Sequence, residues 1–90
     1  MKYRVAWTSD AEADLARIWM QARNRRAVAD AADRLDQSLS IDPMDIGESR
    51  AGGLRLAFAS PLAIEFEVYE PDRTVLVLAV WSPRHGGTTS

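Results

Sequence analysis

Hydrophobic positions alternate in some segments of this chain and recur at helical spacing in others. Residues 2–7 alternate and place Tyr3, Val5 and Trp7 on one side, which predicts a half-buried strand. Residues 54–59, 62–69 and 74–81 have the pattern of three further strands, joined by turns at residues 60–61 and 70–73. Predicted strands therefore lie at both ends of the chain, and residues 8–53 lie between them.

Two helices are predicted in this middle segment. Ser9 and Glu12 have the spacing of a capping box, which predicts Ser9 as the N-cap of the first helix. Asn24 is suited to cap the second helix, and Pro43 ends it. The inward positions are Leu15, Ile18, Trp19 and Ala22 in the first helix and Val28, Ala31, Ala32, Leu35 and Leu39 in the second. The order predicts an α+β fold, a mainly antiparallel sheet packed against a helical hairpin.

The last strand, residues 74–81, is apolar on both faces. With Pro71 and Asp72 at the tip of the turn, the expected facing pairs are Val68 with Val75, Phe66 with Val77, Ile64 with Ala79 and Leu62 with Trp81. These pairs give the sheet one continuous buried face. The other face then carries Leu76, Leu78 and Val80.

The first hairpin is expected to align Leu54, Leu56 and Phe58 with the inward residues. This alignment places Arg55 across from Glu65 or Glu67 on the outer face. A soluble monomer rarely leaves a large apolar strip bare. Sheet curvature or the C-terminal tail could hide this one, or it could be a docking groove for a partner's helix or strand. The predicted partner-binding residues are Leu76, Leu78, Val80, Ala57 and Ala63.

Length and composition indicate a single domain over residues 1–85 with a flexible tail at 86–90. The chain has no cysteine, and we expect no metal and no cofactor. Eleven basic and thirteen acidic residues give a net charge of −2, which counts against a surface devoted to phosphate backbones. No signal peptide is recognisable, and the longest apolar run, residues 75–81, is far too short to span a bilayer. We expect a soluble, cytoplasmic protein that binds no membrane.

Only Arg50, Arg55, Arg84 and His85 could form an active site, and the candidate catalytic residues among them are Arg55, Arg84 and His85. A metal-free ribonuclease needs cations for the developing phosphorane charge and groups for proton transfer. The two arginines at 55 and 84 could supply the cations, and His85 or Glu48 could transfer the proton. Ordinary structural roles are open alternatives, because Arg55 could pair with a cross-strand carboxylate and the other two could be solvated. Residues 23, 25 and 26 are arginines that we interpret as the solvated tip of the hairpin, and the three tryptophans as core anchors.

Several segments together resemble the RelE/ParE superfamily of toxins. Residues 3–15 (YRVAWTSDAEADL) are similar to the strand, cap and acidic first turn that open these proteins. Residues 47–50 with 53–55 resemble the family's loop and strand entry, and residues 81–85 its last strand. The resemblance covers residues 2–85 and implies a growth-inhibiting toxin of a type II toxin–antitoxin module, held in a hetero-oligomer by its cognate antitoxin.

The resemblance implies two possible targets. RelE-like members cleave messenger RNA on the ribosome, and ParE-like members inhibit DNA gyrase. By position, Arg55 matches the strand arginine of the ribonucleases, Arg84 their basic residue near the last strand and His85 a C-terminal catalytic residue. No tyrosine follows Arg84, and the pI near 5.3 is acidic for a ribosome-binding protein. A ParE-like or unassigned target is therefore favoured over an active ribonuclease. The alternatives are an endoribonuclease and a degenerate toxin that binds only its antitoxin.

Overall fold

The computed structural model describes residues 2–46, 48–49 and 51–83, so the predicted tail at 86–90 lies outside the described residues. The elements are β1 (Arg4–Trp7), α1 (Ser9–Gln21), α2 (Arg25–Ile41), β2 (Glu48–Ser49), a 3-10 turn (Ala51–Gly53), β3 (Leu54–Ala59), β4 (Leu62–Tyr69) and β5 (Thr74–Trp81). This is the predicted order, with the short β2 added. No helix among the described residues has both the length and the apolar character that a membrane span requires.

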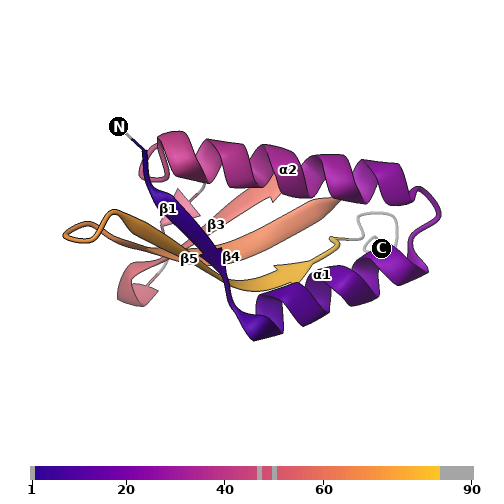
Figure 1. Cartoon of the computed structure of the whole chain (residues 1–90). Coiled ribbons are helices and arrows are strands. Elements are labelled where there is room, and N and C mark those ends of the chain that lie inside the picture. The colour runs from indigo at the N-terminus through magenta and orange to yellow at the C-terminus, as the bar shows by residue number, and fades with distance from the viewer. Residues whose placement is uncertain (1, 47, 50, 84–90) are drawn as a thin grey trace.

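The strands form one sheet in the order β1-β5-β4-β3-β2, and the two helices pack on one of its faces (Figure 1). All neighbouring strands are antiparallel except β1, which runs parallel to β5 at the edge of the sheet. A parallel pair requires a long crossover connection, and here α1, α2 and the following strands provide it. The predicted α+β class, with a mainly antiparallel sheet on a helical hairpin, is therefore confirmed.

The two helix starts differ in how well the sequence predicted them. Asn24 caps α2 as expected, because its side chain accepts a hydrogen bond from the Ala27 amide at 3.0 Å. The N-cap of α1 is Thr8 and not Ser9, so the predicted capping box is wrong by one residue. Thr8 is still extended, and its hydroxyl accepts a hydrogen bond from the Ala11 amide at 3.1 Å.

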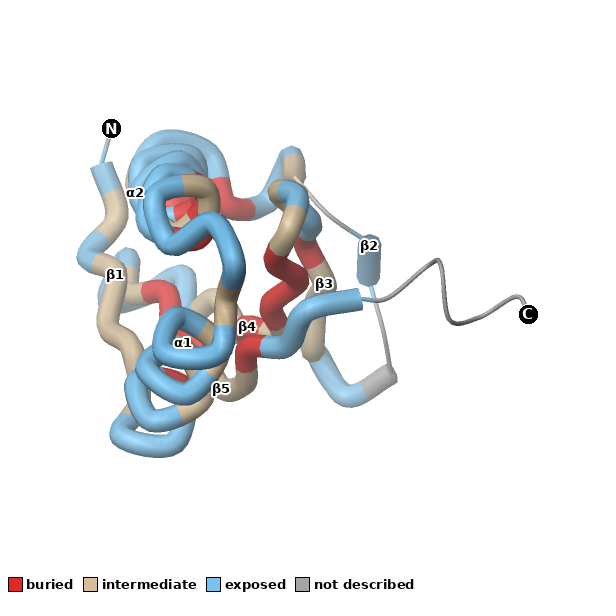
Figure 2. Tube along the Cα trace, turned by 90° about the vertical axis from the view of Figure 1, so that its right-hand side faces the viewer, coloured by how far each residue is buried: buried red, intermediate tan, exposed pale blue. Residues whose placement is uncertain are grey.

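The core lies between the helices and the sheet, where the buried stretches of the chain gather (Figure 2). The inward face of α2 is confirmed, since Val28, Ala31, Leu35 and Leu39 are buried and Ala32 packs against them. The three tryptophans differ in how far they are buried. Trp7 packs against the core, but Trp19 and Trp81 are 42% and 37% exposed, so their prediction as core anchors is wrong.

Candidate functional site

A β-bulge in β5 decides which residues reach each face of the sheet. Val68 pairs with Val75 and Phe66 with Val77, as predicted. The register then shifts between Glu65 and Phe66, so that Ile64 pairs with Val80 and Ala63 with Trp81. The predicted pairs of Ile64 with Ala79 and Leu62 with Trp81 are therefore wrong. The extra residue reverses the alternation, so Val80 enters the core, where it is 4% exposed.

The first hairpin also presents its faces the other way from the prediction. Ala59 pairs with Leu62 across a two-residue turn, and Ala57 pairs with the buried Ile64. These alanines face the helices, and Ala57 is part of the core. Small residues there allow α2 to approach β3 closely. The larger side chains Leu54, Leu56 and Phe58 therefore point to the face that carries neither α1 nor α2.

We call this uncovered side the open face. Its apolar residues lie along β3, β4 and β5: Leu54, Leu56, Phe58, Ala63, Leu76, Leu78, Ala79 and Trp81. Of these, Phe58 is 58% exposed, and it flanks the buried Ala63 with Trp81 on the other side. Of the predicted partner-binding residues, Leu76, Leu78 and Ala63 are on this face, whereas the bulge and the β3 register place Val80 and Ala57 in the core.

Two carboxylates occupy the middle of the open face, on the central strand β4. Glu65 pairs with Leu56 on one side and Ala79 on the other and is half-buried. Its carboxylate has no hydrogen bond or ion pair with any described residue. Glu67 accepts a hydrogen bond from the Tyr69 hydroxyl, and this bond, with a smaller contribution from burial, raises the pKa of Tyr69. The open face therefore combines large apolar side chains with central negative charge.

Arg55, the candidate catalytic cation, does not lie on the open face. It pairs with the buried Phe66, not with a glutamate as predicted, and points to the other side of the sheet. Its guanidinium donates hydrogen bonds to the carbonyl oxygens of Met44 at 2.9 Å and Ile46 at 3.3 Å. A third contact reaches the Ser49 hydroxyl at 3.5 Å. Arg55 thus fastens the loop after α2 to β3.

The other two predicted catalytic residues, Arg84 and His85, lie outside the described residues. The structure therefore brings no catalytic set together within the residues that it describes. Arg55 is the only Lys or Arg in β3, β4 and β5. Its terminal nitrogens are engaged by the loop, while its Nε is buried and has no hydrogen-bond partner among the described residues. These three strands consequently present no cation on the open face.

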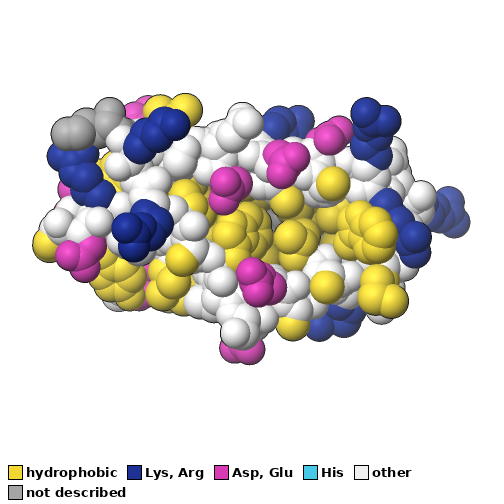
Figure 3. Space-filling view, viewed as in Figure 1, with side chains coloured by type: hydrophobic (Ala, Val, Ile, Leu, Met, Phe, Trp, Pro, Cys, Tyr) yellow, Lys and Arg dark blue, Asp and Glu magenta, His cyan; other side chains and the backbone are white. Residues whose placement is uncertain are grey.

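A second apolar surface, which the sequence analysis did not predict, is a groove between α1 and α2 (Figure 3). It encloses about 430 Å³ over Leu15, Ala16, Trp19, Ala29 and Ala32, with Glu12 and Asp33 at its rim. A smaller hollow continues it toward Trp7 and Asp36, whose side chains are hydrogen bonded at 3.0 Å. The signal was present in the alanines of both helices, which leave space between larger side chains.

Solved structures with this fold include three toxin–antitoxin proteins. The RelBE2 complex from Mycobacterium tuberculosis matches with a TM-score of 0.77 and 22% identity, covering 92% of this chain and 100% of that chain. The chromosomal ParDE system from P. aeruginosa matches with a TM-score of 0.74 and 19% identity, covering 92% and 98%. The intact E. coli RelBE complex matches with a TM-score of 0.63 and 13% identity, covering 91% and 98%.

No family model and no curated protein matches the chain by sequence. The likeness to the three structures spans nearly the whole chain. The chain therefore has the same fold as these RelBE and ParDE structures, which is the fold that the RelE/ParE resemblance predicted.

Proposed function

We propose that this protein is the toxin of a toxin–antitoxin module and that it acts by binding proteins and not by cleaving RNA. The observation that carries this proposal is the open face of the sheet, on which apolar side chains surround Glu65 and Glu67. Large apolar patches on small domains commonly serve as interaction sites. The similar structures from Mycobacterium tuberculosis and E. coli are toxin–antitoxin complexes, which supports an antitoxin as the partner.

The charge of the open face argues against RNA as its ligand. Binding a phosphate backbone relies on Lys and Arg side chains that neutralise the phosphates. Here the central strand carries two carboxylates, and the one arginine of β3–β5 is fastened to loop carbonyls behind the sheet. Of the two targets implied by the family resemblance, we therefore favour DNA gyrase over messenger RNA on the ribosome.

The partner segment must match both properties of the surface. Phe58, Leu76 and Trp81 favour apolar side chains in the partner. The half-buried Glu65, whose carboxylate has no partner among the described residues, favours a Lys or Arg between them. A half-buried carboxylate gains more from such a pair than a fully exposed one, because water screens it less. The antitoxin segment on this face is thus proposed to be basic and apolar in alternation.

The experiment expresses the chain alone and together with the protein encoded beside its gene. We expect growth arrest with loss of gyrase supercoiling and with intact transcripts, and rescue by the partner. Phe58→Glu and Glu65→Lys should each weaken the complex about tenfold or more. Met20→Glu is the matched control, because Met20 is 66% exposed at the C-terminal end of α1, away from this face.

Three results would contradict the proposal. Transcript cleavage that disappears in Arg55→Gln, while urea unfolding shows that the variant is still folded, would establish the endoribonuclease. Loss of the partner in Met20→Glu but not in Phe58→Glu would move the binding site to the helices. Tight partner binding without any growth defect would identify a degenerate toxin that retains only antitoxin binding.

A further inference from the structure

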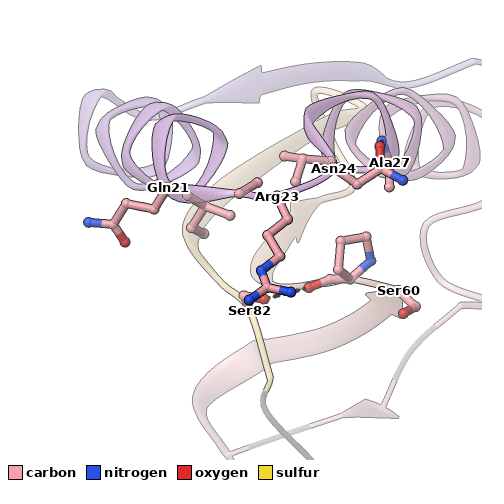
Figure 4. A pocket seen from close by; sticks show the side chains of 10 residues that line it. Gln21, Arg23, Asn24, Ala27, Ser60 and Ser82 are labelled. Carbon is pink, nitrogen blue, oxygen red and sulfur yellow. Dashed lines mark hydrogen bonds between the residues drawn. The ribbon is translucent and has the colours of Figure 1, made fainter.

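A cavity lies between the tip of the helical hairpin and the end of the sheet (Figure 4). It encloses about 600 Å³, within the range of small-molecule sites. The hairpin contributes Ile18, Ala22, Arg23 and Asn24, among others, and the opposite wall consists of Ser60, Pro61 and Ser82. This cavity belongs neither to the open face nor to the groove between the helices.

The arginines at the hairpin tip have separate environments. Arg25 donates hydrogen bonds to the carbonyl oxygens of Trp19 and Met20, both at 3.1 Å, and its guanidinium lies 4.6 Å from the centre of the Trp19 ring. Arg25 therefore caps the carbonyl oxygens at the C-terminus of α1. Arg23 instead reaches from the tip toward Ser82 at the opposite wall (Figure 4). It has no hydrogen bond or ion pair with any described residue.

The other walls of the cavity add polar groups but no negative charge. Among the described residues neither Asp nor Glu lines it, although the protein as a whole is acidic. Ser82 donates its hydroxyl proton to the Pro61 carbonyl at 3.0 Å, and Asn24 accepts from the Ala27 amide, so the Asn24 side-chain N–H groups stay available. Beside them, Ile18, Ala22 and Val28 form an apolar wall.

We propose that this cavity binds a carboxylate carried on an apolar body, with Arg23 holding the carboxylate. A guanidinium pairs with a carboxylate through two parallel hydrogen bonds, and one guanidinium balances one negative charge. The apolar wall accommodates the hydrocarbon part of the ligand. A phosphate dianion would leave charge unbalanced and the apolar wall unused. The carboxylate can belong to a free small molecule or to an Asp or Glu side chain of a bound polypeptide.

Nuclear magnetic resonance titration of the full chain with benzoate tests the proposal independently of any toxic activity. We expect saturable shifts of amides around Arg23, Ala27 and Ser60, with a dissociation constant of about 1 mM, as for other small fragments. Acetate, which lacks the apolar body, benzyl alcohol, which lacks the carboxylate, and inorganic phosphate should each bind about tenfold more weakly.

Variants at the hairpin tip provide the matched comparison. Arg23→Gln should weaken benzoate binding about tenfold, while Arg26→Gln, which removes a neighbouring arginine that does not line the cavity, should leave it unchanged. Both should unfold at the wild-type urea midpoint, because neither side chain bonds to a described residue. Equal benzoate affinity in Arg23→Gln and wild type, or equal shifts with acetate or phosphate, would overturn the proposal.

A second titration distinguishes the two sources of the carboxylate. If the antitoxin complex no longer binds benzoate, the partner supplies the carboxylate. If the complex binds benzoate as the free chain does, the ligand is a free small carboxylate. The site itself is judged on the partner-free chain, so its failure and the failure of the proposed toxin function are separate results.

Discussion

The two faces of the sheet are built from the same three strands and differ in almost every property. Toward the helices, Phe66, Val75 and Val77 are fully buried and tightly packed. On the open face, Phe58 is largely exposed and Glu65 lies among apolar neighbours. Folding therefore relies on the face toward the helices, while the open face is available for binding. Substitutions on the face toward the helices should therefore change the free energy of unfolding, and substitutions on the open face should change partner binding.

The largest effect is expected from matched phenylalanine substitutions on the two faces. Phe66→Ala should lower the free energy of unfolding by about 3–5 kcal/mol, because it opens a cavity in the core. Phe58→Ala should lower it by less than about 0.5 kcal/mol, because the ring is mostly in water. Urea unfolding measures both values. If Phe66→Ala does not fold, Phe66→Leu replaces it, and similar losses at positions 58 and 66 would contradict the division of roles.

Arg55 is the one charged residue of β3–β5 on the helix side of the sheet. Arg55→Ala should cost about 1–3 kcal/mol of unfolding free energy, since the Met44 and Ile46 carbonyls lose their donor. Arg55→Lys should recover only part of this, because an ammonium group lacks the forked geometry. Faster amide hydrogen exchange in residues 42–46 would locate the loss. Unchanged stability in Arg55→Ala would refute the structural role.

The strand bounds were predictable from the sequence, but the faces were not. Residues 54–59, 62–69 and 74–81 are the observed β3, β4 and β5, because alternation and proline turns mark where strands begin and end. In β5 every residue after Thr74 is apolar, so the pattern contains nothing that reveals a bulge at Leu78. In β3 the larger residues were assigned inward, whereas the core next to α2 takes alanines.

The residues of the open face were also only partly predictable from the sequence. The sequence identified a sheet with an uncovered apolar face, and Leu76, Leu78 and Ala63 are on it. It did not reveal that loop carbonyls bind Arg55. Every residue has a backbone carbonyl, so the residue types do not show which carbonyls will lie near Arg55. Nor could the sequence separate Arg23 from Arg25, because only the folded hairpin turns one toward α1 and the other toward the cavity.

The smallest expected effect concerns Asp14, which completes the edge of β5 on the helix side. Beyond the bulge β5 has no pairing with β1, whose register ends at Trp7, and the Val80 amide donates instead to Asp14 at 3.3 Å. The Arg17 guanidinium, 2.7 Å away, and then this amide hold the pKa of Asp14 below its ordinary value of 3.8. The depressed pKa means that the folded state binds this proton less readily than the unfolded state does.

The contribution of Asp14 to stability is therefore complete above its unfolded pKa and is lost as the pH falls through the lower folded pKa. Asp14→Asn should be less stable than wild type by about 0.5–1.5 kcal/mol at neutral pH. The two curves of unfolding free energy should converge as the pH falls below about 4. Arg17→Gln should show a weaker pH dependence than wild type, because it removes the larger cause of the shift. A difference between Asp14→Asn and wild type that stays constant down to the lowest pH would mean that the carboxylate's charge plays no part in holding α1 to the edge of β5.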